Sequence, residues 1–240
     1  MNVVIVGSYG NQGMNESDFV QEFVRRMQIH PLWQHPFFQL VRTDPTLAIL
    51  QQWAIQAGRI DQAFAEILTN MLANPTINPS MYAAIRENLN DELGNGDPRQ
   101  EHFTLFQNVL EAIGVSTEQY LTTPMTQGTE RIIYSLLESS RGTDPTPILG
   151  MMASEELICP NEFPLFLEAM SCYGTPHQLR YFDEHIQADV RHSYDLIRLC
   201  YQAAGGSQEQ IRELFRWQAV DLDNNVTFYN DLTELVENNR

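Results

Sequence analysis

Cysteine is scarce in this chain, and the few cysteines are scattered. Only Cys159, Cys172 and Cys200 occur in 240 residues, and no Cys-x-x-Cys pair is present. A disulfide framework needs more cysteines, and a zinc ribbon needs paired ones, so both are excluded. A reducing compartment suits such a chain, and we therefore expect a cytoplasmic protein.

Basic residues and long apolar runs are also lacking. Lysine and arginine together number 14 against 31 acidic residues, which gives a formal net charge of −17. Because a phosphate backbone requires a basic surface, nucleic acid is not an expected partner, and anionic membranes are disfavoured. No apolar run approaches the ~20 residues that span a membrane. Residues 1–7 lack the basic segment of a signal peptide.

Alternating strand patterns are nearly absent, and Val3–Val6 alone indicates a strand. Elsewhere apolar residues recur at the spacing of helices, interrupted by glycine, proline and Asn-Pro pairs. Helical segments are expected at 20–27, 47–57, 60–72, 81–93, 100–113, 129–137, 148–158, 163–173, 178–204, 208–217 and 222–236, and a short segment at 37–41 follows Pro36. The pattern predicts an all-α protein, a single bundle of about seven to ten helices over residues 1–240. Residues 1–15 are expected to form an N-terminal arm.

Two segments imitate ligand-binding motifs. Residues 3–13 look like a strand that leads into a glycine-rich phosphate loop, but the glycine spacing is wrong and no βαβ unit follows. Residues 221–225 look like the start of a calcium loop, but the turn glycine is missing and Leu232 stands where the closing glutamate belongs. We interpret the second segment as a polar helix cap.

The strongest chemical pattern is formed by His185, Asp189 and His192. These residues lie at i, i+4 and i+7, so a helix projects all three from one face. Two imidazoles and a carboxylate on one face suit a divalent transition metal. The apolar residues of this segment are too few to bury the helix unless its histidine face also points inward.

Other helices must supply the remaining ligands, as they do in di-iron bundles. The candidates are Glu66, the pair Glu92 and His102, and one of the adjacent glutamates Glu155 and Glu156. The two adjacent glutamates lie in a very apolar segment, where burying an unpaired carboxylate is costly.

At these positions the sequence resembles the haem-oxygenase-like di-iron oxidases and oxygenases. Their bundle is shared with TenA/PqqC-type proteins and the chlamydial death-domain-associating protein. The resemblance runs from about Phe64 to Leu199 and rests on the Asn88–Glu92 segment, on Glu156-x3-Pro160 and on His-x3-Asp-x2-His. It implies two iron ions with O2 as co-substrate. It places His102 and His185 mainly at one iron, with Glu66 as a companion, and Glu92, Asp189 and His192 mainly at the other. Glu156, favoured over Glu155 by its distance to Pro160, would face both.

The resemblance also implies the class of reaction. Members oxidise small amino-acid or carboxylate substrates in natural-product biosynthesis, and conversion of a halogenated tryptophan into an indole nitrile is the specific hypothesis. Three alternatives share the bundle: a TenA-like hydrolase without a cofactor, with Cys159 as its nucleophile, a fatty-acid oxidative decarboxylase, and a binding or interaction protein. Arg191, Phe182 and Phe103 are candidates for substrate binding. A homodimer and an external electron donor are also expected.

Overall fold

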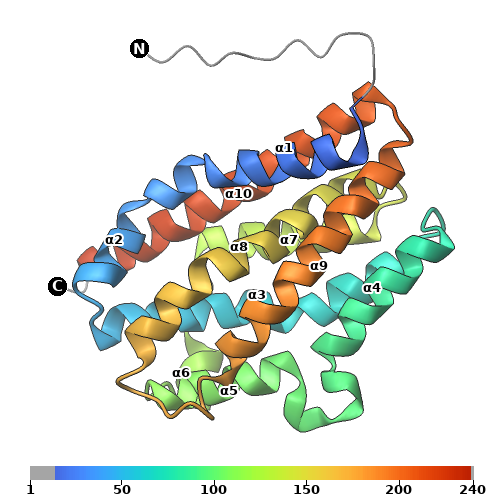
Figure 1. Ribbon diagram of the computed structural model, residues 1–240. Helices are drawn as coiled ribbons and strands as arrows, with labels where there is room; N and C mark the ends of the chain where they lie inside the picture. The colour runs from blue at the N-terminus through green and yellow to red at the C-terminus, as the bar shows by residue number, and fades with distance from the viewer. Residues whose placement is uncertain (1–13, 239–240) are drawn as a thin grey trace, which may run out of the picture.

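The computed structural model describes residues 14–238, and all regular elements within that range are helices. Ten α-helices and three short 3₁₀ helices follow one another (Figure 1). Their bounds are α1 Glu16–Gln28, η1 Pro31–Gln34, α2 Pro36–Thr43, α3 Leu47–Leu72, α4 Pro79–Glu92, η2 Gly94–Gly96, η3 Pro98–Gln100, α5 His102–Ala112, α6 Thr117–Thr122, α7 Gln127–Arg141, α8 Thr146–Met170, α9 Arg180–Ala204 and α10 Gln208–Asn238. The all-α prediction is confirmed.

Three sequence predictions fall on the ends of the chain. The strand at Val3–Val6 and the glycine-rich segment at residues 3–13 lie outside the described residues, as does the expected arm up to residue 13. Asn15 is described, and its side chain caps α1 by accepting a hydrogen bond from the backbone N–H of Asp18. In the described range no helix is both long and apolar enough to cross a membrane.

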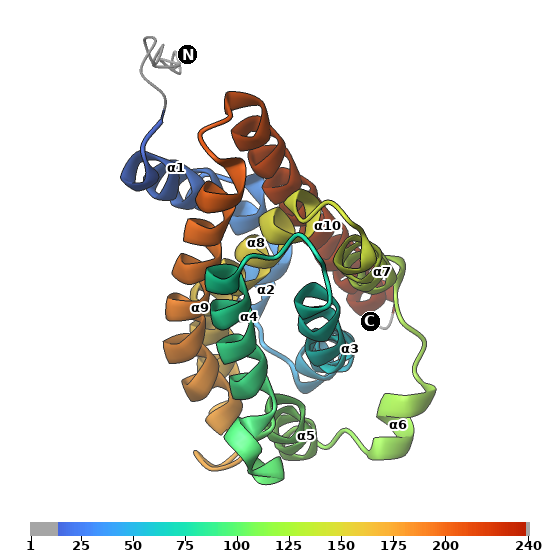
Figure 2. The same ribbon diagram turned by 90° about the vertical axis from the view of Figure 1, so that its right-hand side faces the viewer.

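Helix α8 lies in the middle of the bundle. It packs most extensively against α9 and next against α10, while α3 packs against α7, α4 and α5. Figure 2 shows α8 between α9 and α10, with α4 beside α9. Because 16 of the 25 residues of α8 are buried, this helix has no solvent face along most of its length. Side chains on several of its faces therefore point into the protein interior.

Three helices are longer than the sequence pattern predicts. Helix α3 continues through Gly58, α8 through Pro160 and Pro164, and α10 through the segment that resembles a calcium loop. A proline in a helix removes one backbone hydrogen bond. Both prolines follow the fully buried stretch 148–158, whose packing holds α8 in place despite that loss, and the Asn161 side chain donates to the backbone oxygen of Leu157 at 2.8 Å.

Glycine in α3 has a packing role. A Cβ atom at Gly58 would lie 2.7 Å from the Phe106 ring of α5, so the glycine permits this close approach. The pattern thus marks a contact between helices, whereas the sequence analysis interpreted it as a break. The short helix α6, capped by the Ser116 hydroxyl, was not predicted at all.

Candidate metal centre

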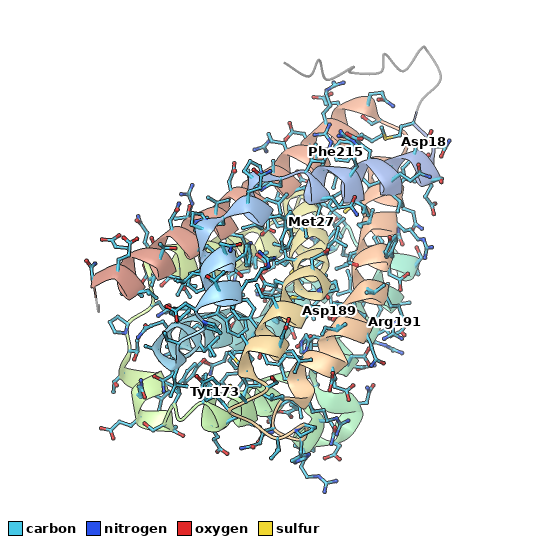
Figure 3. All side chains as sticks on the ribbon, turned by 60° about the vertical axis from the view of Figure 1, so that its left-hand side comes forward. Asp18, Met27, Tyr173, Asp189, Arg191 and Phe215 are labelled. Atoms are coloured by element: carbon cyan, nitrogen blue, oxygen red, sulfur yellow. The ribbon has the colours of Figure 1, made fainter. Side chains whose placement is uncertain are left out.

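Helix α9 buries one complete face that carries the three predicted ligands. His185, Asp189 and His192 are all buried, although charged and polar groups of this kind rarely are without partners. Figure 3 shows Asp189 on the side of α9 toward α8, whereas Arg191 lies on the other side. The histidine face therefore points inward, as the scarcity of apolar residues on this helix indicated.

One cluster joins α4, α5 and α9. Ligand atoms of Glu92, His102 and His185 all lie within 4.8 Å of one another. His102 Nδ1 is 2.8 Å from Glu92 Oε1, and the rings of His102 and His185 are 4.2 Å apart. The turn between α4 and α5 makes this possible, because Gly94, Asn95 and Gly96 all adopt positive φ angles and reverse the chain sharply.

A second cluster joins α8 and α9. Ligand atoms of Glu156, Asp189 and His192 also lie within 4.8 Å of one another. His192 Nδ1 is 3.6 Å from Glu156 Oε2 and 3.7 Å from Asp189 Oδ1. Asn88 of α4 donates to Glu156 Oε1 at 2.5 Å, which fixes the orientation of that carboxylate. The two clusters are neighbours, since Asp189 also interacts electrostatically with Glu92.

Hydrogen bonds decide which ring nitrogen each α9 histidine turns toward its cluster. His185 Nδ1 lies 2.9 Å from the backbone oxygen of Tyr181, so Nε2 is left for a metal. His192 Nε2 lies 2.9 Å from Asp91 Oδ2, so Nδ1 faces the carboxylates of its cluster. Arg191 holds the same Asp91 oxygen at 2.6 Å. Such outer contacts orient metal-binding imidazoles in known centres.

Burial and neighbouring charges shift the pKa values of the residues in the two clusters. Burial raises the pKa of Asp189 well above its usual range, and the charge of Glu156 adds to the effect. Burial lowers the pKa of His185 well below its usual range. Burial also opposes the charged form of His192, but the nearby carboxylates of Asp189, Glu156 and Asp91 prevail and raise its pKa to about 11.

The residues fit a pair of iron ions. Asp189 Oδ2, His192 Nδ1 and Asn88 Oδ1 are buried and have no hydrogen-bond partner in the described chain. Buried polar atoms are rarely left unpaired, so their presence at one place indicates a missing partner. Three imidazoles and three carboxylates are donors that suit iron, and neither cluster contains a thiolate.

The structure differs from the sequence analysis in two details of this site. Glu66 does not reach either cluster: its side chain is exposed and pairs with Arg141 at 2.6 Å. Five residues along a helix turn the side chain by about 140°, so Asp61 of α3 faces inward instead. Glu92, assigned by the resemblance mainly to the group of Asp189, lies with His102 and His185.

Asp61 is the residue that the sequence analysis missed. Its Oδ1 accepts a hydrogen bond from the Tyr181 hydroxyl at 2.8 Å, and its buried Oδ2 has no partner among the described residues. Burial, with a contribution from Glu92, raises its pKa to about 7. The signal lies in helical phase, since Trp53, Ala57 and Asp61 share the spacing of one face.

The adjacent glutamates of α8 point in different directions. Glu156 enters the second cluster, while Glu155 accepts a hydrogen bond from Asn225 of α10 at 2.8 Å and lies beside Asp221. Asp221 is fully buried within α10. The interpretation of residues 221–225 as a polar helix cap was therefore wrong, because the segment is the middle of a long helix packed against α8.

A cavity of about 60 Å³ lies beside the clusters. It is lined by Trp53, Ala57, Ile60, Asp61, Phe64, Glu92, Phe106, Glu155, Glu156, Ile158, Cys159, Glu162, Phe163, Tyr181, His185, Asp189, Asn225, Phe228 and Tyr229. The predicted substrate residues are not among them. Arg191 pairs with Glu87 and Asp91, Phe182 is core beside Trp53, and Phe103 packs on Tyr120.

Comparison with solved structures places the fold. A domain of unknown function with a haem oxygenase-like fold from Shewanella denitrificans matches with a TM-score of 0.76 at 16% identity, covering 93% of this chain and 94% of that one. A TenA homologue from Pseudomonas syringae pv. tomato gives 0.75 at 14%, with 92% and 96% covered. A CADD-like protein of unknown function from Nostoc punctiforme gives 0.73 at 16%, with 92% and 98% covered. The fold is therefore haem oxygenase-like, as predicted.

Comparison of the sequence identifies the protein family. Curated protein sequences give no match. The family model described as "Iron-containing redox enzyme" matches residues 51–223, a range that includes both buried clusters. The chain belongs to this family of iron-containing redox enzymes.

Proposed function

We propose that the protein is a non-haem di-iron oxidase or oxygenase that uses O2 to oxidise a small organic molecule. The observation that carries this proposal is the pair of neighbouring buried clusters, each with one or two histidines and one or two carboxylates. Two bound iron ions would supply the electrons and the open coordination positions that O2 activation requires. Membership of an iron-containing family supports the choice of metal.

The residues around the clusters have separate tasks in this proposal. Glu92, His102 and His185 hold one ion, and Glu156, Asp189 and His192 hold the other. Asp91 and the Tyr181 backbone fix the imidazoles of His192 and His185. Asp61 stands next to the first set and is held by the Tyr181 hydroxyl, so it can accept or return a proton there.

The cavity wall contributes by excluding water. Trp53, Phe106 and Phe163 line it, and their rings pack against one another at centroid distances of 6.3 Å from Trp53 to each of the other two. An apolar wall strengthens the electrostatic interactions inside and limits wasteful side reactions. This wall also restricts the substrate to a small or slender molecule.

Anaerobic loading with Fe(II) tests the proposal. We expect about two irons per chain and an O2-dependent absorbance band after exposure to air. Glu92→Gln removes a carboxylate from the first cluster, so it should reduce the bound iron to about one per chain. Glu66→Gln makes the same chemical change on the surface and should leave the iron content unchanged. Less than one tightly bound iron in the unmodified protein would overturn the proposal.

The substrate hypotheses can be ordered by the cavity. Oxidation of an amino acid is favoured, with formation of an indole nitrile from tryptophan as the specific reaction to test first. A fatty acid is less suitable, because Glu162 would lie near its apolar chain. Oxygen uptake measured with tryptophan, its halogenated forms and a fatty acid would separate these reactions.

A further inference from the structure

The cavity reaches well beyond the metal clusters along α8. Glu156 and Glu162 both line it, and six residues of helix separate them by about 9 Å along the axis. Tyr229 of α10 lies beside Glu162 and packs against Phe37 and Phe38 of α2, with ring centroids 5.4 and 4.5 Å apart. Figure 1 shows α2 and α4 on opposite sides of the bundle. Glu162 therefore marks the end of the cavity away from the metals.

Glu162 is buried there without a cationic partner. Glu162 is only 8% exposed, and its Oε2 accepts a hydrogen bond from the Tyr229 hydroxyl. Its Oε1 receives no hydrogen bond from any described residue. The chain contains no lysine, and no arginine is among the described residues that line the cavity. Burial accordingly raises the pKa of Glu162 to about 8.

The His35 imidazole does not neutralise Glu162 either. His35 lies 5.8 Å from the Tyr229 ring, measured between centroids. Its Nδ1 accepts a hydrogen bond from the Phe37 backbone N–H at 3.2 Å, so the proton is on Nε2, which lies 3.0 Å from Asn230 Oδ1. An imidazole with one accepting nitrogen is uncharged. Without a cation this buried carboxyl group is costly to ionise, so it keeps its proton until a cation enters the cavity.

Aromatic side chains also line the cavity, among them Trp53, Phe163, Phe228 and Tyr229. Phe228 packs against Tyr229 at this end, with ring centroids 5.0 Å apart. Aromatic faces attract ammonium and guanidinium groups, most strongly where water is excluded. A carboxylate among aromatic rings is a chemical match for an organic cation, whereas it would repel a carboxylate or phosphate group.

We propose that Glu162, together with Tyr229 and the aromatic wall, binds the cationic group of the substrate, a primary ammonium or a guanidinium. The substrate would then lie along α8, with its cation at Glu162 and the bond to be oxidised near Glu156 and Asp189. This assignment rests on the proposed function for its reacting end. It makes Glu162 a specificity-determining residue and defines the substrate class as compounds that carry an ammonium or guanidinium group, which include the amino acids of the proposed function.

A set of three probes tests the unmodified protein. Pentylamine, 1-pentanol and pentanoate share one carbon chain and differ in the charge of the head group. We expect pentylamine to bind at least about tenfold more tightly than 1-pentanol and pentanoate to bind most weakly, in calorimetric titrations at pH 7. Equal affinity for amine and alcohol, or tighter binding of pentanoate, would overturn the proposal without any need for a variant.

A matched pair of variants then assigns the effect to one side chain. Glu162→Gln should weaken pentylamine binding by about tenfold or more and leave 1-pentanol binding unchanged. Glu168→Gln changes an exposed carboxylate of the same helix and should alter neither affinity. The proposal is wrong if both variants bind pentylamine as the unmodified protein does.

Metal content separates this proposal from the proposed function. The titrations are run on metal-free protein and on anaerobic Fe(II) protein, and Glu162→Gln should still bind about two irons. Preferential amine binding without iron binding would leave the cation site intact and refute the di-iron function. Iron binding without a preference for the amine would support the di-iron function and refute the cation site.

Discussion

The two ends of the cavity are built from similar side chains and differ in what accompanies them. At one end, Glu92, Glu156 and Asp189 lie among three histidines, two of which have rings oriented by further hydrogen bonds. At the other end, Glu162 meets Tyr229, which donates a hydrogen bond but carries no charge. The first set is complete for binding metal ions, and the second is suited to a cation that arrives with a ligand.

The adjacent residues Glu155 and Glu156 show how one helix sends neighbouring side chains to different partners. Successive residues of an α-helix point about 100° apart, so one glutamate turns toward α9 and the other toward α10. This division requires α8 to be buried on several faces. The comparison predicts that changes at one end leave the other end working, and the following experiments test that independence.

Asp189 should show the largest effect, because it belongs to the second cluster and also interacts with Glu92 of the first. We expect Asp189→Asn to bind one iron or fewer and to lower O2 consumption by at least about 100-fold. Asp183→Asn, an exposed change on the same helix, is the control and should behave like the unmodified protein. Full iron content in Asp189→Asn would show that this carboxylate is not a ligand.

Iron binding should also reduce the local opening of α9, and only at the metal end. Without metal, the buried carboxylates around Asp189 repel one another, so we expect the segment His185–His192 to open more readily. At a free Fe(II) concentration about 100 times its dissociation constant, exchange of these amides should slow by up to about 100-fold. Amides near Tyr229 in α10 provide the internal reference. Equal protection with and without iron would contradict the expected coupling.

A smaller effect concerns the pH dependence of metal-free stability. Burial raises the pKa of Glu162 from 4.5 to about 8, while the Tyr229 hydrogen bond opposes the shift and Glu155 adds to it. A raised carboxyl pKa means that the folded protein holds a proton which the unfolded chain loses above pH 4.5. Stability from this group is therefore full below pH 4.5 and declines until about pH 8.

Replacing the Glu162 carboxyl group removes its contribution to the loss of stability with rising pH. Glu162→Gln should become more stable than the unmodified protein by about 1 kcal/mol or more as the pH rises from 5 to 8.5. Urea unfolding of metal-free protein at several pH values measures the difference. Tyr229, Glu155, Cys159 and the neighbouring His35 also face this region, so Glu168→Gln is measured in parallel. A difference that does not change with pH would show that Glu162 is ionised in the folded protein.

Local patterns revealed most of the metal centre from the sequence. His185, Asp189 and His192 lie on one helix, so their common face follows from helical geometry alone. Glu92 and His102 were found because a glycine turn between them brings two helix ends together. Each of these inferences needs only residues that are close in the chain.

The failures involve distant contacts. The choice between Asp61 and Glu66 depends on which face of α3 meets α9, and no short pattern contains that information. A proline often ends a helix, but α8 continues through Pro160 because the turns before it are buried and the helix packs against α9 and α10. Asp221 resembled a loop residue for the same reason, since its burial against Glu155 depends on α8.

Cys159 gives the smallest expected effect and separates two kinds of chemistry. Its thiol lines the cavity between the two ends and contacts the backbone oxygen of Glu155 at 3.5 Å. Burial, with nearby Asp189 and Glu162, raises its pKa well above the usual range, so the nucleophilic thiolate is disfavoured. Cys159→Ser should therefore keep O2 consumption within about twofold, with exposed Cys172→Ser as its control. Loss of all turnover in Cys159→Ser alone would instead favour a TenA-like hydrolase, in which a cysteine attacks the substrate and the buried carboxylates assist it.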